Sequence, residues 1–246
     1  MCNVPQQRYE FAEGVFQKFL DEENDYSKFR IGKDLSRTVP GNSEFMLSPS
    51  SGKNRLFNLL KAYTAYDPQV GYCQGMNLIA SMLLRMIPDQ EDAFWAFVFL
   101  MFERDWRTIF LDDAKKVGYL LADLEAYFKV YCKSVYRHVL NDEFASWEAS
   151  FTSHLITLFI CDNEFEHALR VMDLFMLEGE QILVDILATM VQIKKQKILQ
   201  LDELELMDYL RKDMAAECFA EYPMDKLLGK HPLVPLTNTM LYKAQL

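Results

Sequence analysis

Apolar residues recur at helical spacing along most of the chain. Steps of three and four residues separate them in three stretches: Leu56, Leu59, Leu60 and Tyr63; Ile79, Ala80, Leu83 and Leu84; and Val117, Leu120, Leu121 and Leu124. Such steps place side chains on one face of an α-helix. Neither an Asn-Gly or Asp-Gly turn nor a run of strict two-residue alternation marks a strand. The pattern therefore predicts an all-α protein.

Turn signals divide this pattern into many helices. Ser51-Gly52 is expected to begin one helix and Asp67-Pro68 to end it. Pro88-Asp89 separates the next two predicted helices, and Gly179 follows another. The frequent stop signals favour a bundle of short helices over a coiled coil.

Two later segments are apolar on more than one face. Residues 147–161 and 166–177 have the composition of helices that lie in the middle of a bundle. We expect Trp147, Met172 and Phe175 to pack in the core. From Pro223 onwards the helical pattern weakens.

Composition and charge narrow the classes of partner. Half of the 246 residues are hydrophobic and 25% are charged, as in an ordinary globular protein. The 36 acidic residues outnumber the 26 basic ones and give a net charge of −10, so nucleic acids and anionic membranes should be repelled. The densest basic run, residues 194–197, is expected to be a solvated helix face. No apolar run reaches the roughly 18 to 20 residues of a membrane span, so no membrane insertion is expected.

Residue types for metal or nucleotide chemistry are poorly placed. The five cysteines are never spaced as CxxC, and free thiols in the cytoplasm fit them best. The four histidines are too far apart for a metal pair, and no P-loop is present. Asp162, Glu164 and Glu166 lack the spacing of a calcium loop and are expected to flank a helix. We expect no metal site and no cofactor in this chain.

Two segments remain, IGKDLSRTVP at residues 31–40 and DPQVGYCQGMN at residues 67–77. Asp34 and Arg37 are three residues apart, so on a helical turn the carboxylate can hold the guanidinium in one direction. Taken alone, such a pair is a common surface contact. Cys73 has no base near it in sequence, and a small buried residue is a simpler interpretation than a nucleophile.

Together, IxxDxxRTxP and DPxVGYCQGMN resemble the paired signature of the TBC domain of Rab GTPase-activating proteins. The resemblance continues through SGKNRLFNLLKAYTAYDPQVGYCQGMNLIASMLL and RVMDLFMLEGEQIL and covers roughly residues 28–220. It implies one domain over residues 1–246, an all-α fold of two packed helical lobes. The lobe of residues 1–140 would carry both motifs, and residues 141–246 would form the second lobe.

The resemblance also implies a mechanism that acts in trans. Arg37 would neutralise charge on the phosphoryl group that a Rab GTPase transfers, and Gln74 would position the attacking water. GTP and Mg²⁺ would belong to the GTP-bound partner, so the chain would have no independent catalytic activity. It would act in the cytoplasm on vesicle trafficking, recruited to endomembranes through partners.

The neighbours of the two fingers gain roles from the same resemblance. Asp34 would orient Arg37. Gly71 and Gly75 would allow another backbone to come close. Tyr72, Cys73 and Asn77 would shape and support the Gln74 finger.

Three departures from the family pattern define the alternatives. His154 and Met172 stand where the family commonly has Trp, and no Trp-bearing helix precedes the first motif. One alternative is a TBC-like helical adaptor that binds a small GTPase without activating it. The other is a helical scaffold with no GTPase partner. The sequence carries no signal of oligomeric state.

Overall fold

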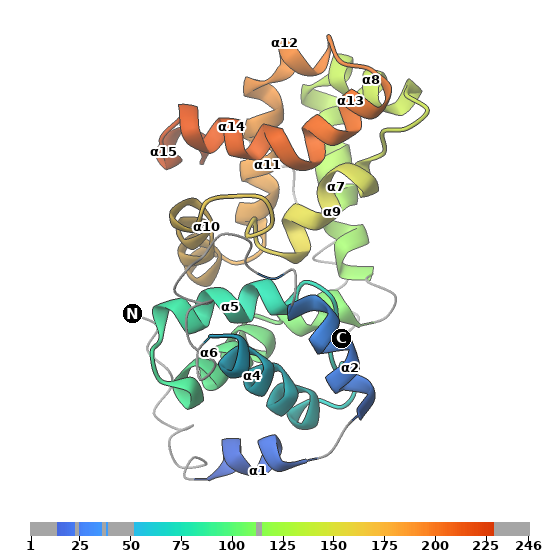
Figure 1. Ribbon diagram of the computed structural model, residues 1–246. Coiled ribbons are helices and arrows are strands. Elements are labelled where there is room, and N and C mark those ends of the chain that lie inside the picture. The colour runs from blue at the N-terminus through green and yellow to red at the C-terminus, as the bar shows by residue number, and fades with distance from the viewer. Residues whose placement is uncertain (1–13, 23–24, 36–37, 39–51, 112–114, 229–246) are drawn as a thin grey trace. The chain divides into compact units, whose positions relative to one another are not determined.

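The structure, a computed structural model, describes residues 14–22, 25–35, 38, 52–111 and 115–228 (Figure 1). Throughout these ranges the regular elements are helices and there is no strand. The prediction of an all-α protein is confirmed. Within the same ranges, no helix is long and apolar enough to cross a membrane.

The chain divides into two compact units, Met1–Leu111 and Asp112–Leu246. Helix α7 (Lys115–Tyr131) belongs to the second unit, where it packs on α8 (Lys133–Asn141), α9 (Trp147–Ile156) and α11 (Gln181–Ile193). The lobe boundary near residue 140 that the family resemblance implies stays a prediction.

The first unit is built around α4, which packs against α1, α2, α5 and α6. Its elements, in chain order, are α1 (Val15–Asp21), α2 (Asp25–Leu35), α4 (Gly52–Tyr66), α5 (Met76–Met86), α6 (Gln90–Glu103) and the 3-10 helix η2 (Trp106–Phe110). Leu59 and Tyr63 of α4 are completely buried, and the Tyr63 ring meets Phe97 of α6 edge to face at 4.9 Å. The apolar stripe predicted for α4 is therefore the centre of this core.

Helix ends in the first unit follow the turn signals. α4 ends at Tyr66, directly before Asp67-Pro68, and α5 ends at Met86, two residues before Pro88. Asp89 caps α6 because its carboxylate accepts a hydrogen bond from the Asp92 N–H at 2.9 Å. These predictions are confirmed.

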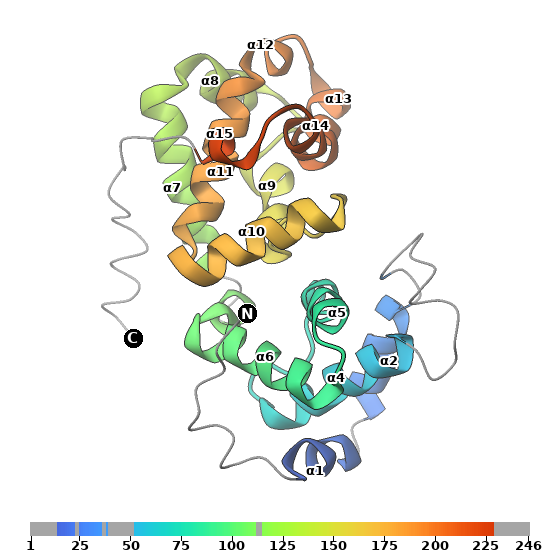
Figure 2. The same ribbon diagram turned by 90° about the vertical axis from the view of Figure 1, so that its left-hand side faces the viewer.

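The second unit is built around α11, which packs on α7, α10 and α14 (Figure 2). After α7, its elements are α8 (Lys133–Asn141), α9 (Trp147–Ile156), α10 (Phe165–Glu178), α11 (Gln181–Ile193), α12 (Lys195–Ile198), α13 (Glu203–Asp208), the π-helix η4 (Tyr209–Asp213), α14 (Met214–Glu221) and α15 (Met224–Leu227). Gly179 ends α10 as predicted, with a φ of 87°.

The helix predicted over residues 147–161 is shorter in the structure. α9 ends at Ile156, because Leu158 and Phe159 adopt left-handed backbone conformations with φ of 51° and 61°. Both of these side chains are completely buried. The turn therefore directs two consecutive apolar side chains into the core, which a continuing helix would spread over different faces.

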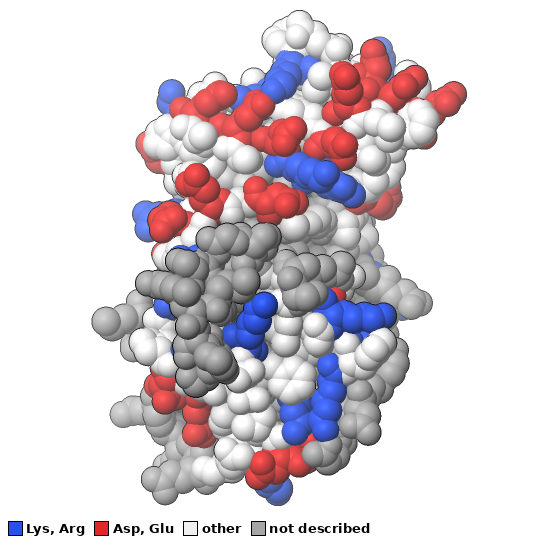
Figure 3. Space-filling model, in the orientation of Figure 1, with Lys and Arg blue, Asp and Glu red and all other residues white. Residues whose placement is uncertain are grey.

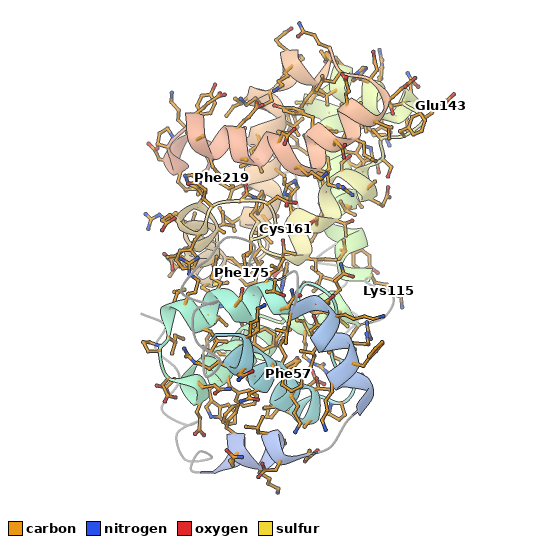
Figure 4. The ribbon with its side chains drawn as sticks, viewed as in Figure 1. Phe57, Lys115, Glu143, Cys161, Phe175 and Phe219 are labelled. Atoms are coloured by element: carbon orange, nitrogen blue, oxygen red, sulfur yellow. The ribbon has the colours of Figure 1, made fainter. Side chains whose placement is uncertain are left out.

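The predicted core residues of the second unit are buried. Trp147, Met172 and Phe175 are at most 7% exposed, and Figure 4 labels Phe175 on α10. The Trp147 ring stacks on Phe128 with 5.1 Å between ring centroids. The core assignment is confirmed.

His154 is also a core residue. It is 1% exposed, and its Nε2 lies 3.1 Å from the carbonyl oxygen of Leu210 in η4. Burial lowers the pKa of His154, so the neutral ring is favoured and Nε2–H donates to that carbonyl. The imidazole ring also stacks against Phe159 at 5.3 Å.

The basic run at residues 194–197 differs from the prediction. Lys194 is buried, and its Nζ binds the carboxylates of Glu221 at 2.8 Å and Glu217 at 3.1 Å. Lys197 also binds Glu217. The prediction of a solvated face was wrong for Lys194, because α14 brings two carboxylates to it.

Candidate functional site

The two sequence motifs come together in the first unit. Asp34 lies in the last turn of α2, and residues 67–75, here called the Gln74 segment, join α4 to α5. Helix α2 packs on both α4 and α5 (Figure 1). The packing therefore brings motifs that are separated in sequence to one place.

A network of buried hydrogen bonds joins the motifs. The Tyr72 hydroxyl donates to Asp34 Oδ2 at 2.6 Å and lies 3.3 Å from Asn77 Oδ1. Asn77 Oδ1 accepts from the Gly75 N–H at 3.1 Å, and Asn77 Nδ2 donates to Thr38 Oγ1 at 2.7 Å. The Thr38 hydroxyl donates to the backbone carbonyl of Asp34. We call Asp34, Thr38, Tyr72 and Asn77 the buried network.

Burial gives this network its rigidity. Its four side chains are at most 6% exposed. A buried polar group without a partner is costly, so each hydrogen bond favours this one arrangement. The network fixes the end of α2 against the start of α5. Thr38 was not singled out from the sequence, although it is the Thr of the RTxP motif.

Of the two predicted finger residues, the structure describes Gln74 and not Arg37. Gln74 is exposed, between the half-buried Cys73 and the buried Gly75. Arg37 lies outside the described residues, between Asp34 and Thr38 in the sequence. Its orientation by Asp34 stays a prediction, and the Asp34 carboxylate binds Tyr72.

Two glycines give the Gln74 segment its backbone path. Gly71 has a φ of 64°, and Gly75, which precedes α5, has a φ of 101°. Residues that carry a side chain rarely adopt these left-handed backbone conformations. A Cβ on Gly71 would meet no atom within 4 Å, so conformation and not space accounts for this glycine within the chain. The close approach of a partner backbone stays a prediction.

Cys73 has the environment of a packing residue. Its N–H points at Met76 Sδ at 3.3 Å, and its thiol lies 3.9 Å from the Val70 carbonyl oxygen. Burial raises the pKa of the Cys73 thiol despite the opposing charge of Arg30. A protonated thiol is a poor nucleophile.

Asp67 holds the start of the Gln74 segment. Its carboxylate receives two hydrogen bonds from Arg107, from Nε at 3.0 Å and from Nη2 at 2.9 Å. The Tyr63 hydroxyl donates to Asp67 Oδ2 at 3.0 Å, and burial, together with this carboxylate, raises the pKa of that hydroxyl. The sequence marked Asp67 only as a helix stop. It gave no signal for Arg107, which reaches Asp67 through the packing of η2.

The described residues contain no group of three or more His, Cys, Asp or Glu side chains that could hold a metal ion. Among them, Gln74 is an exposed residue on a segment whose two ends are held by hydrogen bonds. An amide both donates and accepts hydrogen bonds, so it can orient a water molecule without transferring a proton.

Comparison with known proteins places the chain among its relatives. Residues 4–199 match the family model of the Rab-GTPase-TBC domain. The human ecotropic viral integration site 5 protein homolog is 31% identical over 183 residues, which are 74% of this chain and 22% of that protein. The Rab GTPase-activating protein eat-17 of Caenorhabditis elegans is 30% identical over 201 residues, 81% of this chain and 22% of that protein. The chain thus spans 22% of the length of each of these relatives.

Two crystal structures share the fold. The Chlamydomonas flagellar RabGAP TBC domain has a TM-score of 0.77 at 23% sequence identity. The match covers 92% of this chain and 73% of the Chlamydomonas chain. The Ypt/Rab-GAP domain of Gyp1p has a TM-score of 0.73 at 15% sequence identity, and the match covers 98% of this chain and 81% of the Gyp1p chain. The family match covers most of the sequence, and these folds agree with it. The chain belongs to the Rab-GTPase-TBC domain family.

Proposed function

We propose that this chain activates GTP hydrolysis by a Rab-family small GTPase in its GTP-bound form, with Arg37 and Gln74 as two fingers inserted in trans. One observation carries the proposal: the buried network joins the two motifs, while Gln74 itself stays exposed. A relative named a Rab GTPase-activating protein and the shared TBC fold support it.

The chemistry suits this division between two proteins. Phosphoryl transfer depends mainly on positioning and on stabilising charge, and little covalent help is needed. The Arg37 guanidinium neutralises charge on the transferred phosphoryl group, and the Gln74 amide orients the attacking water. An arginine finger accelerates such reactions by about 10³ to 10⁵. GTP and Mg²⁺ belong to the GTPase, so the chain needs no cofactor of its own.

The same proposal sets where the chain acts. A Rab partner would bring it from the cytoplasm to the surface of an endomembrane, in the service of vesicle trafficking. No residue of this chain then has to enter the lipid.

Single-turnover GTP hydrolysis tests the proposal. We expect this protein, in excess over each of a panel of GTP-loaded Rab proteins, to accelerate hydrolysis by at least one of them. Arg37→Ala and Gln74→Ala should each remove most of the acceleration. The matched controls Arg137→Ala and Gln200→Ala, which change exposed residues of the second unit, should retain it. If no Rab responds, the proposal is overturned.

Binding assays separate an activator from an adaptor. An activator is complementary to the transition state, so its affinity for a GDP-loaded Rab should rise when aluminium fluoride is added. An adaptor that merely binds would show equal affinity with and without aluminium fluoride, and hydrolysis would stay at the intrinsic rate.

A further inference from the structure

Asp67, at the start of the Gln74 segment, is held by two side chains from outside the segment, Tyr63 of α4 and Arg107. Arg107 lies in η2, which follows α6, and its guanidinium forms a bidentate pair with Asp67. Its Nη2 also donates to Gln69 Oε1 at 3.1 Å. The guanidinium group lies over the Phe102 ring at 4.8 Å, which restricts its direction further.

We propose that Arg107 is a positioning residue for Gln74, which it holds in place through Asp67 and Gln69. This inference rests on the proposed function, because it assigns Arg107 a part in the same reaction. Arg107 does not touch the partner's nucleotide in this proposal. Its effect reaches the reaction only through the Gln74 segment.

The contacts of Asp67 show how the effect is transmitted. Its Oδ1 accepts from the Val70 N–H at 3.4 Å, and its carbonyl oxygen accepts from the Gly71 N–H at 2.8 Å. The place and direction of Asp67 therefore set where the turn at Val70 and Gly71 begins. Asp67 is 4% exposed, so the pair with Arg107 is shielded from water on its acidic side.

The far end of the segment is fixed separately. Tyr72 binds Asp34, and the Gly75 N–H binds Asn77. Gln74 thus lies between one anchor made by the buried network and another made by Arg107. Displacing a catalytic group by about 1 Å can cost about 100-fold in rate, so an anchor at each end matters for positioning.

The geometry requires an arginine. A guanidinium presents several N–H groups in a fixed plane and binds both carboxylate oxygens at once, whereas an ammonium group is a single point of charge. Arg107→Lys therefore keeps the charge beside Asp67 and removes the two-point contact. This substitution isolates the positioning role from simple charge pairing.

Kinetics at saturating protein give the first test. We expect Arg107→Lys to lower the single-turnover rate by about 10- to 100-fold, with at most about a 3-fold change in affinity for the GTP-bound Rab. Arg104→Lys is the matched control, since the Arg104 Nε has no hydrogen-bond partner among the described residues. It should leave both quantities unchanged. An unchanged rate in Arg107→Lys overturns the inference.

A double-mutant cycle distinguishes positioning from general stability. If Arg107 acts through Gln74, adding Arg107→Lys to Gln74→Ala should lower the rate by no more than about 2-fold. Losses that multiply in the double variant would show that Arg107 acts on something other than Gln74, and would overturn the inference.

Hydrogen exchange tests the same inference without any GTPase. The amides of Val70 and Gly71 should exchange at least about 10-fold faster in Arg107→Lys, while amides of α11 keep their wild-type rates. If the wild-type protein activates no Rab, the proposed function fails, yet this measurement still reports whether Arg107 holds the segment. Unchanged exchange at Val70 and Gly71 overturns the inference in either case.

Discussion

Tyr72 shows how one hydroxyl group links two motifs. It donates to a buried carboxylate oxygen of Asp34 at 2.6 Å. Tyr72→Phe keeps the ring and removes this donor, so Asp34 loses one of its hydrogen bonds in a buried place. We expect the free energy of unfolding to fall by about 1 to 3 kcal/mol, measured by guanidinium denaturation.

Tyr66→Phe is the matched control for Tyr72→Phe. Tyr66 packs edge to face against Phe19 and Phe94, and its hydroxyl makes no hydrogen bond to the residues described here. Its loss should change the free energy of unfolding by less than about 0.5 kcal/mol. Equal effects of the two substitutions would contradict the role assigned to the buried network.

Sequence reasoning found some of these side chains and missed others. Asp34, Tyr72 and Asn77 were named because they stand inside the two motifs, and the structure brings the three into one network. Arg107 was missed because no local sequence pattern indicates its contact with Asp67. Its partner Asp67 is near only after α4, α6 and η2 have packed, and such pairs follow from tertiary structure.

At the scale of elements, the Gln74 segment depends on its backbone as much as on its contacts. Gly71 has a φ of 64°, which is unfavourable for any residue with a Cβ. Gly71→Ala should lower the free energy of unfolding by about 1 to 2 kcal/mol, although a methyl group there meets no atom within 4 Å. Thermal or chemical denaturation measures this.

A second glycine gives a control of opposite sign. Gly118 lies inside α7, where an added Cβ also meets nothing within 4 Å. Because alanine favours a helix interior over glycine, Gly118→Ala should stabilise the protein by up to about 1 kcal/mol. A stabilising effect of Gly71→Ala would show that its left-handed conformation is not maintained.

The contact between α9 and η4 predicts a dependence on pH. Burial lowers the pKa of His154 below the ordinary value of about 6.5. Below about pH 6.5, His154 binds a proton in the unfolded chain but stays neutral in the folded protein. The free energy of unfolding should therefore decrease as the pH is lowered below about 6.5, by at most about 1.4 kcal/mol per pH unit. The decrease should stop once the pH is below the pKa of His154 in the folded protein.

His154→Gln tests this dependence. The glutamine amide can still donate to the Leu210 carbonyl but does not titrate. Chemical denaturation between pH 7.5 and 5.5 should show a shallower fall in stability for the variant. Parallel curves for the two proteins would contradict a buried neutral His154.

Helix ends were more predictable than irregular turns. Pro68, Pro88 and Gly179 act locally, so the sequence marked the ends that they cause. The early end of α9 depends instead on burying Leu158 and Phe159, which is a property of the assembled core. Lys194 was misjudged for a related reason, since its carboxylate partners come from another helix.

At the scale of the whole molecule, charge sets which surfaces the chain avoids. The net charge is −10, and many acidic side chains cover the face of the second unit seen in Figure 3. At about 0.15 M salt, exposed charges repel like charges within about 8 Å. We expect no binding to duplex DNA or to phosphatidylserine vesicles under these conditions.

Co-sedimentation with vesicles and gel shifts with DNA measure this expectation. Vesicles carrying a GTP-loaded Rab should recruit the protein, whereas bare anionic vesicles should not. Saturable binding to bare vesicles would contradict the expectation and would point to a basic surface on this chain.

Fold class and family followed from the sequence, because helical spacing recurs along most of the chain and the family resemblance extends well beyond the two motifs. The packing partners of α7 did not follow from the sequence. A sequence shows where helices begin. The helices that α7 packs against depend instead on the shapes of the faces that it buries.

The exposure of Gln74 and the burial of the side chains behind it have a consequence for cells. A Gln74→Ala protein should accumulate to normal amounts while it fails to function, because Gln74 is exposed and its amide makes no hydrogen bond to the residues that the structure describes. An Asn77→Ala protein should instead be depleted by quality control, since even about 1 to 2 kcal/mol of lost stability can lower abundance several-fold. Alleles at neighbouring positions of one motif would therefore give different phenotypes, an inert protein at Gln74 and a scarce one at Asn77.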